Sequence, residues 1–335
     1  MKKRILFSML LATGIIISGC AKSEDAGSDS SDGSGSEKEG SKTYTIGVTQ
    51  IVEHPSLNEA YKGFQAALEE KGVKVEFSVK NAQGDPNTNT TIAQGFANDK
   101  VDLIFANSTP SAQAALSATK DIPIVFTSVT DAVGAGLVKS LDEPGENITG
   151  TIDTHPEGIP NTIKFIKEQL GGKNVGFIYN SGEQNSVVQI ETAKKELEKL
   201  GMKAVTASVS TSAEVKQAAE SLVGKIDAFY VMTDNTVVSA LSSVISVANE
   251  KDIPLFAGEH DSVKAGAFAG YGVSYYDIGF TAGNMAAQIL EGEKKPSELP
   301  VQPPKESKLG INKKAASEMG IELKPEWDSM AEYIE

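Results

Sequence analysis

The strongest constraint on the fold of this chain is an internal repeat. The segment Lys71-Gly-Val-Lys-Val75 has a counterpart in Leu200-Gly-Met-Lys-Ala204. Two further pairs follow in the same order and at nearly the same spacing: Val101-Asp-Leu-Ile-Phe105 with Ile226-Asp-Ala-Phe-Tyr230, and Asp121-Ile-Pro-Ile-Val-Phe126 with Asp252-Ile-Pro-Leu-Phe256. Because order and spacing are both kept, the sequence predicts two lobes of similar topology.

Each copy of the repeat alternates strands and helices. In the first copy the apolar pattern predicts strands over 44–50, 73–79, 101–105 and 122–126, and helices over 57–70 and 87–98. Short apolar runs of this kind are typical of parallel strands that are buried on both faces. The predicted fold class is therefore α/β, with two similar doubly wound parallel-sheet lobes.

The segment after the second copy is expected to join the lobes. A helix over 276–290 and a strand near 309–311 follow residue 272. We predict that the chain here crosses back between the lobes, so that this helix and strand complete both lobes and the connections form a multi-strand hinge. We therefore expect an N-terminal lobe of 43–151 plus about 276–305, and a C-terminal lobe of 152–272 plus about 306–335.

The first residues are typical of an export signal. A positive Met1-Lys-Lys-Arg4 precedes an apolar run over 5–17, which is too short to span a bilayer comfortably and is typical of a secretory signal peptide, 1–19. Ile17-Ser-Gly-Cys20 resembles the lipobox of bacterial lipoproteins and predicts lipidation of Cys20; the alternative is a small buried cysteine. Residues 20–42 carry no apolar side chain larger than alanine after Cys20, and we expect a disordered tether.

Composition excludes several functions. Lys and Arg total 31 against 45 Asp and Glu, a net charge of −14, so no basic surface for nucleic acid is expected. One cysteine cannot form an intramolecular disulfide, and three histidines leave little for a transition-metal site. The motifs of P-loop enzymes, zinc proteases and serine hydrolases do not occur. We expect no catalytic residues, no cofactor and no metal.

Ligands of open α/β sheets bind beyond the carboxyl ends of the strands, so the candidate residues follow the predicted strands. In the first lobe these are Gln50, Ile51, Glu53, His54, Ser108, Thr109, Thr127 and Asp131. In the second lobe they are Tyr179, Glu183, Asn185, Ser186, Asp234, Asn235 and Asp261. Several also fit a plain structural role: Thr109 precedes Pro110 as a helix cap would, and Asp234 either caps a helix or offers a carboxylate to a ligand ammonium.

Several segments carry a resemblance to a known family. They are Ile46-Gly-Val-Thr-Gln-Ile-Val-Glu-His-Pro55, Asn81-Ala-Gln-Gly-Asp85, Ile122-Pro-Ile-Val-Phe-Thr127, Thr233-Asp-Asn-Thr236 and Tyr275-Tyr-Asp-Ile-Gly279. With them the chain resembles the substrate-binding lipoproteins of ABC importers with a type I periplasmic-binding-protein fold, and within these the tryptophan- and tyrosine-binding family of Gram-positive bacteria. Ala132 and Ser181 depart from it, since the family pattern has proline at both positions.

The resemblance implies capture of an α-amino acid, most of all tryptophan or another aromatic one, by closure of the two lobes on a hinge. Its carboxylate would face Ser108, Thr109, Asn185 and Ser186, its ammonium would pair with Asp234 or Asp153, and its side chain would pack near Ile51, His54, Thr127 and Tyr179. The implied partners are an ABC permease and its ATPase, served by a monomer held on the extracellular face of the membrane through Cys20.

Two alternatives remain. One is a receptor of the same fold for another metabolite, such as a sugar or a nucleoside; sugar readers of this fold usually sandwich the ring with aromatic side chains, and only 6% of this chain is aromatic. The other is a surface enzyme.

Overall fold

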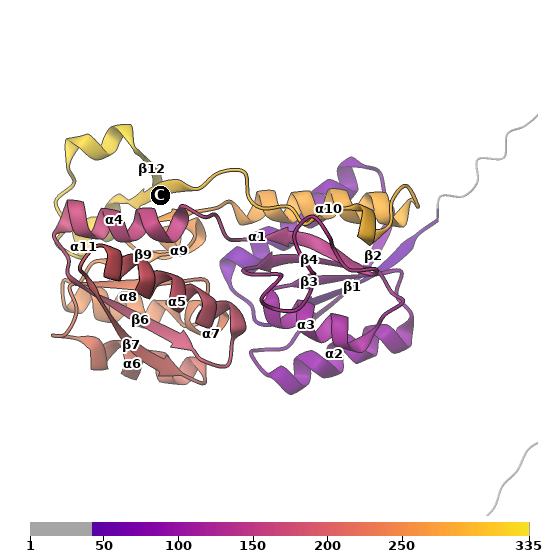
Figure 1. Ribbon diagram of the computed structural model, residues 1–335, viewed down its shortest axis with the longest axis horizontal. Helices are drawn as coiled ribbons and strands as arrows, with labels where there is room; N and C mark the ends of the chain where they lie inside the picture. Colours follow the sequence, from indigo (N-terminus) through magenta and orange to yellow (C-terminus); the bar gives the residue numbers. More distant parts are fainter. Residues whose placement is uncertain (1–41, 335) are drawn as a thin grey trace, which may run out of the picture. The chain divides into compact units, whose positions relative to one another are not determined.

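The computed structural model describes residues 42–334, so the predicted signal peptide, Cys20 and nearly all of the tether lie outside the described residues. The first sheet has five strands in the order β2-β1-β3-β4-β5, and all of its paired strands are parallel (Figure 1). Its strands are β1 (Tyr44–Gln50), β2 (Val75–Asn81), β3 (Leu103–Asn107), β4 (Ile124–Val129) and β5 (Ile148–Ile152). Its helices are α1 (Pro55–Glu70), α2 (Pro86–Asp99), α3 (Thr109–Ala118) and α10 (Tyr275–Leu290).

Side chains of β3 show how this sheet is covered on both faces. Leu103 and Phe105 belong to a core shared with α1 and α10, whereas Ile104 and Ala106 belong to a core shared with α2 and α3. Successive strand residues point to opposite faces, so an uninterrupted apolar run needs a helical layer on each side.

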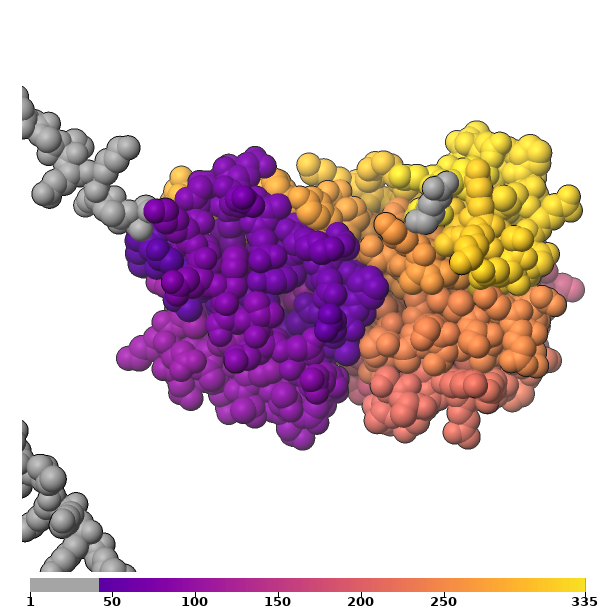
Figure 2. All heavy atoms as spheres, turned by 180° about the vertical axis from the view of Figure 1, so that it is seen from behind, coloured from indigo at the N-terminus to yellow at the C-terminus, as the bar shows by residue number. Residues whose placement is uncertain are grey.

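Glycines let α1 and α10 approach closely. A Cβ atom on Gly279 would lie 2.6 Å from the carbonyl carbon of Ala60, and one on Gly63 would lie 2.8 Å from the backbone nitrogen of Phe280. Real side chains do not tolerate such distances, so the helices meet backbone to backbone. Figure 2 shows orange atoms of this late part of the chain beside the indigo atoms of its first described part.

The second sheet repeats the topology of the first. Its order is β12-β11-β10-β9-β8-β6-β7, so read from β7 its first five strands follow the same 2-1-3-4-5 pattern. Its strands are β6 (Asn174–Asn180), β7 (Lys203–Val209), β8 (Ala228–Val231), β9 (Leu255–Ala257), β10 (Ala269–Gly272), β11 (Lys308–Asn312) and β12 (Ala331–Ile334). Its helices are α4 (Gly158–Leu170), α5 (Gln184–Lys199), α6 (Val215–Leu222), α7 (Asn235–Val238), α8 (Leu241–Glu250), α9 (His260–Ala265) and α11 (Lys313–Glu318). The fold class predicted from the repeat is confirmed.

The chain passes from one sheet to the other three times: between β5 and α4, between β10 and α10, and between the short 3-10 helix Pro296–Glu298 and β11. Backbone hydrogen bonds of Gln302 with Gly150 and Ile152 tie the first and third crossings together. The strands observed begin and end about two residues later than predicted in three places, at β2, β3 and β4. Within 42–334 no helix is long and apolar enough to cross a membrane.

Candidate functional site

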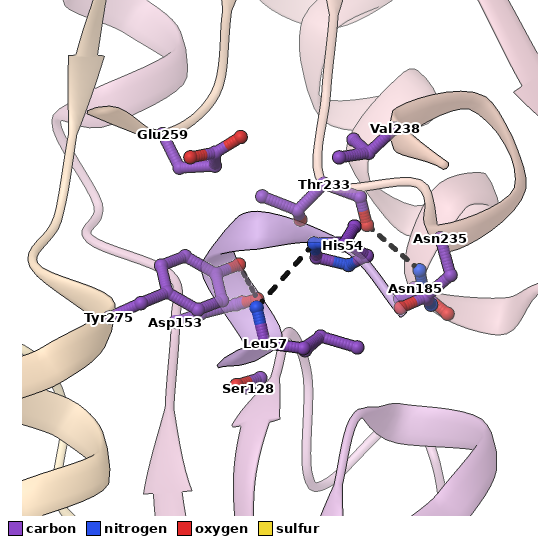
Figure 3. A pocket seen from close by; sticks show the side chains of 10 residues that line it. All are labelled: His54, Leu57, Ser128, Asp153, Asn185, Thr233, Asn235, Val238, Glu259 and Tyr275. Atoms are coloured by element: carbon purple, nitrogen blue, oxygen red, sulfur yellow. Dashed lines mark hydrogen bonds between the residues drawn. The ribbon is translucent and has the colours of Figure 1, made fainter. Parts of the chain in front are cut away.

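A small cavity of about 10 Å³ lies where loops of both sheets meet (Figure 3). It is lined by His54, Leu57, Ser128, Asp153, Asn185, Thr233, Asn235, Val238, Glu259 and Tyr275. Four of the predicted site residues are among them: His54, Asn185 and Asn235, predicted from strand ends, and Asp153, implied by the family resemblance. The others of the ten were not predicted as site residues.

His54 lines the cavity from the first residue before α1. Its ring accepts the backbone N–H of Leu57 at 3.5 Å and so caps the helix. Burial lowers the pKa of His54 to about 4, against a smaller opposing effect of the Asn235 side chain. The imidazole is therefore neutral at pH 7, and its contact with Asn235 connects the first lobe to the second.

Ser128 is positioned by a polar network at the ends of β1, β3 and β4. The Ser128 hydroxyl donates to Asn107 at 2.9 Å, and the Asn107 amide donates to Gln50 at 3.1 Å and to the carbonyl of Leu57 at 2.8 Å. Ser128 and Ser108 both have positive φ, at 56° and 107°, a conformation that costs a residue with a side chain energy and is concentrated at functional sites.

Asp153 directly follows β5 and points into the cavity. Its carboxylate accepts the Tyr275 hydroxyl at 2.7 Å. Burial raises the pKa of Asp153, and the hydroxyls of Tyr275, Thr130 and Thr154 oppose this only in part. Both Asp153 and Tyr275 lie in segments that cross between the sheets, after β5 and after β10.

Glu259 is a second buried carboxylate in the cavity wall, with only 2% of its surface exposed. Its two oxygens share one backbone donor, the N–H of Ser262, at 3.1 and 2.9 Å. Burial raises the pKa of Glu259, and the hydroxyls of Ser262 and Ser56 oppose the shift. The sequence signal for this residue was its place in the loop after β9, where the prediction named Asp261 instead.

Asp234 and Glu183 are buried carboxylates of a different kind, because protein donors occupy them. Asp234 accepts the N–H of Val237 at 2.8 Å, the N–H of Asn180 at 2.6 Å and the hydroxyl of Ser186 at 2.7 Å. Burial and then the charge of Glu183 raise the pKa of Asp234 to about 7. Asp234 thus caps α7, and neither residue lines the cavity.

Glu183 accepts still more donors. Asn185 and Asn235 donate through their side-chain amides at 3.1 and 2.5 Å, and Thr236 through its N–H and hydroxyl at 3.0 and 2.8 Å. The N–H of Asn235 adds a fifth bond at 3.2 Å. This network orients the two asparagines at the cavity wall.

The remaining predicted residues lie behind or beside the cavity. Gln50, Ser108, Thr109, Thr127 and Ser186 are buried among neighbouring loops. Ile51 and Glu183 line a wider groove that Asn235 also borders. Asp131 accepts the N–H of Gly134 in a tight turn, Tyr179 packs against the core of the second sheet, Asp261 is half-buried, and Glu53 is exposed.

The wall of the cavity contains two carboxylates and no lysine or arginine. Among residues 42–334 no cluster of three or more His, Cys, Asp or Glu has the geometry to hold a metal ion. The Asn185 side-chain oxygen is buried without a hydrogen-bond partner. The unmet acceptors therefore match a ligand that brings N–H donors and positive charge.

A family model described as ABC transporter substrate binding protein matches residues 45–332. The chain therefore belongs to the family of ABC transporter substrate-binding proteins, with the type I periplasmic-binding-protein fold. It is 44% identical over 325 residues to a "Tyrosine-binding protein" of Clostridioides difficile (strain R20291), covering 93% of this chain and 91% of that protein.

Two solved structures are informative about conformation. One is an ABC domain from Streptococcus pneumoniae in complex with L-Trp, 34% identical, with a TM-score of 0.83 over 88% of this chain and 100% of that one. The other is the ligand-free, open structure of a substrate-binding protein with adhesive properties from Clostridium difficile, 41% identical, with a TM-score of 0.64 over 87% of this chain and 100% of that one. The better-conserved relative superposes less well, as a different angle between otherwise similar lobes would produce. This chain therefore superposes better on the complex with L-Trp than on the ligand-free, open structure.

Proposed function

We propose that the residues around this cavity bind an aromatic α-amino acid, and that the protein delivers it to the permease of an ABC importer. The cavity of about 10 Å³ has space for about one water molecule, so the two lobes would have to move apart to admit the ligand. The observation that carries the proposal is Asp153, a buried carboxylate in the cavity wall whose side-chain partners are neutral hydroxyls, that of Tyr275 at 2.7 Å and that of Thr154 at 3.4 Å. A buried charge is stabilised by an opposite charge, and the ammonium of an amino acid supplies one. The names of the relatives, a tyrosine-binding protein and a complex with L-Trp, support the same ligand class.

The rest of the ligand follows from this anchor. The Asn185 side-chain oxygen, a buried acceptor without a partner, would accept a further N–H of the ligand. Leu57, Val238 and the ring of Tyr275 supply the apolar wall for an aromatic side chain. The neutral His54 completes the wall without adding a charge.

The protein itself would act as a monomeric binding protein and not as an enzyme. Removal of 1–19 and lipidation of Cys20 would hold it on the extracellular face of the membrane, and the residues up to 42 would form the tether. The lipobox-like Ile17-Ser-Gly-Cys20 supports this part of the proposal. The family pattern quoted above favours a Gram-positive source.

Thermal unfolding tests the ligand class. Protein refolded to remove any bound ligand would be heated with each of the aromatic amino acids, glucose, ribose and adenosine. A ligand at 100 times its dissociation constant adds about 2.7 kcal/mol, which raises the midpoint by roughly 5–10 °C for a chain of this size. A shift with an aromatic amino acid is expected; a shift with only a sugar or nucleoside would refute the proposal.

A further inference from the structure

We propose that Glu259 accepts a hydrogen bond from the ring donor of the ligand, so that the site prefers tyrosine and tryptophan to phenylalanine. The phenol O–H and the indole N–H are donors that phenylalanine lacks. The inference rests on the proposed function and adds the residue that would select among the aromatic amino acids.

The donors around the buried carboxylates single out Glu259. Glu183 accepts five hydrogen bonds and Asp234 accepts three. Glu259 accepts one protein N–H within ordinary hydrogen-bond geometry, that of Ser262, shared between its two oxygens. The hydroxyls of Ser56 and Ser262 and the N–H of Asp261 also lie near its carboxylate. An ionised carboxylate offers about four acceptor positions, and of the three carboxylates Glu259 accepts hydrogen bonds from the fewest protein donors.

Glu259 also has no counter-charge in the described part of the chain. It takes part in no salt bridge there, and the cavity that it lines contains no lysine or arginine. Burying a carboxylate without compensation is costly. A donor from the ligand, brought in when the cavity closes, supplies part of that compensation.

The position of Glu259 favours a ring donor over the ammonium. The ammonium needs one carboxylate, and Asp153 has the hydroxyl of Tyr275 to orient it. Figure 3 shows the carboxylate of Glu259 apart from that of Asp153. The α-ammonium and the ring donor of tyrosine or tryptophan are likewise at separate ends of the molecule, with an apolar ring between them.

Helix capping alone does not account for Glu259. It caps α9, a helix of six residues, through the Ser262 N–H. Glutamate is not among the preferred capping residues, which are Ser, Thr, Asp and Asn. A cap would also serve equally well if its carboxylate were exposed, whereas that of Glu259 is enclosed in the cavity wall.

The test is a double-mutant cycle in which the Glu259 side chain is changed on the protein and the ring donor is changed on the ligand. Isothermal titration would measure the affinity of the wild type, Glu259→Met and Glu259→Gln for tyrosine, tryptophan and phenylalanine. A hydrogen bond to a charged group corresponds to about a 10- to 150-fold difference in affinity. We therefore expect the wild type to prefer tyrosine or tryptophan to phenylalanine by at least tenfold, and Glu259→Met to reduce this preference below threefold with phenylalanine binding kept.

Glu259→Gln retains an acceptor and should keep part of the preference. The matched control is Glu157→Met, which removes another glutamate at the first position before a helix, exposed and outside the cavity; the preference should not change. Circular dichroism checks that each variant is folded, and O-methyltyrosine and 1-methyltryptophan repeat the test on the wild type by blocking the ligand's donor.

Three results would overturn the inference. An unchanged preference in Glu259→Met would make Glu259 a helix cap only. An equal loss of affinity for tyrosine and phenylalanine would make it a partner of the ammonium. Failure of the wild type to bind any of the three amino acids would refute the proposed function and the inference with it, a result separate from the first two.

Discussion

Replacing Asp153 by asparagine should separate ligand affinity from stability. In the wild type the Tyr275 hydroxyl donates to a carboxylate oxygen of Asp153 at 2.7 Å. Asparagine has the same shape as aspartate, and its side-chain oxygen can still accept this hydrogen bond. What is lost is the charge opposite the ligand ammonium. Removing one partner of a buried, hydrogen-bonded charge pair costs about 2–5 kcal/mol, so affinity should fall about 30- to 3,000-fold.

Stability without ligand should respond in the other direction. Burial raises the pKa of Asp153 because its ionised form has no cation beside it. A neutral side chain of the same size removes that penalty. The unfolding midpoint of ligand-free Asp153→Asn should therefore equal or exceed that of the wild type.

Asp234→Asn provides the comparison. One carboxylate oxygen of Asp234 accepts both the N–H of Asn180 and the hydroxyl of Ser186, at 2.6 and 2.7 Å, and the other accepts the N–H of Val237 at 2.8 Å. The amide nitrogen of asparagine would replace one of these oxygens and lose its bonds. Each lost bond costs roughly 1.5–3 kcal/mol, and relief of the repulsion from Glu183 offsets part of it. We expect a loss of about 2 kcal/mol and a midpoint lower by roughly 4–8 °C, with less than a fivefold change in affinity.

Isothermal titration and differential scanning calorimetry on both variants decide the matter. We expect lower ligand affinity in Asp153→Asn and a lower unfolding midpoint in Asp234→Asn. The opposite assignment, with affinity lost in Asp234→Asn and kept in Asp153→Asn, would refute it and make Asp234 the partner of the ammonium.

Three further predictions concern pH, packing and anchoring. Because the pKa of Asp153 is raised and only its ionised form attracts an ammonium, amino-acid affinity should fall on acidification at a pH above the ordinary pKa of an aspartate, and fall less in Asp153→Asn. His54, with a pKa of about 4, is neutral near neutral pH. Equal acid sensitivity of the wild type and Asp153→Asn would contradict the role of Asp153. Gly279→Ala should lower the unfolding midpoint, because its Cβ would lie 2.6 Å from the carbonyl carbon of Ala60 and overpacking costs about 1–3 kcal/mol. Gly95→Ala in α2, where a Cβ would meet nothing within 4 Å, should raise the midpoint slightly. Equal effects of the two substitutions would be inconsistent with the close contact between α1 and α10. Cys20→Ala should release the protein from membranes in a fractionation assay, and retention would refute lipid anchoring.

The fold was largely predictable because it rests on repeated local patterns. The paired segments around Asp121-Ile-Pro and Asp252-Ile-Pro mark β4 and β9, which occupy equivalent positions in the two sheets. Short apolar runs also predicted that the sheets are mainly parallel. The short β12 and the antiparallel pairing of β10 with β11 had no such signal, since the C-terminal segment belongs to neither copy of the repeat.

The site was less predictable, because the difference between a cap and a ligand partner depends on distant residues. Asp234 and Glu259 both follow strands of the second lobe and both cap short helices. Asp234 accepts hydrogen bonds from Asn180 and Ser186, which lie far away in the sequence, whereas the one distant group near the Glu259 carboxylate that bears on its pKa through a hydrogen bond is the Ser56 hydroxyl. Strand-end position found Asp234 but named Asp261 in place of Glu259, and only the folded contacts show which carboxylate accepts hydrogen bonds from fewer donors.

Asp153 and Tyr275 connect ligand binding to closure. Both lie in segments that cross between the sheets, and the hydrogen bond between them joins two crossings at the cavity wall. The first lobe adds only neutral groups to the closed cavity, namely His54, Leu57 and Ser128. Closing an empty cavity would thus bury two carboxylates without a cation, whereas closing it around an ammonium pairs one of them. On the proposed function, the ligand is therefore the counter-charge that makes the closed arrangement favourable, and the permease would receive a protein whose closure reports that its ligand is present.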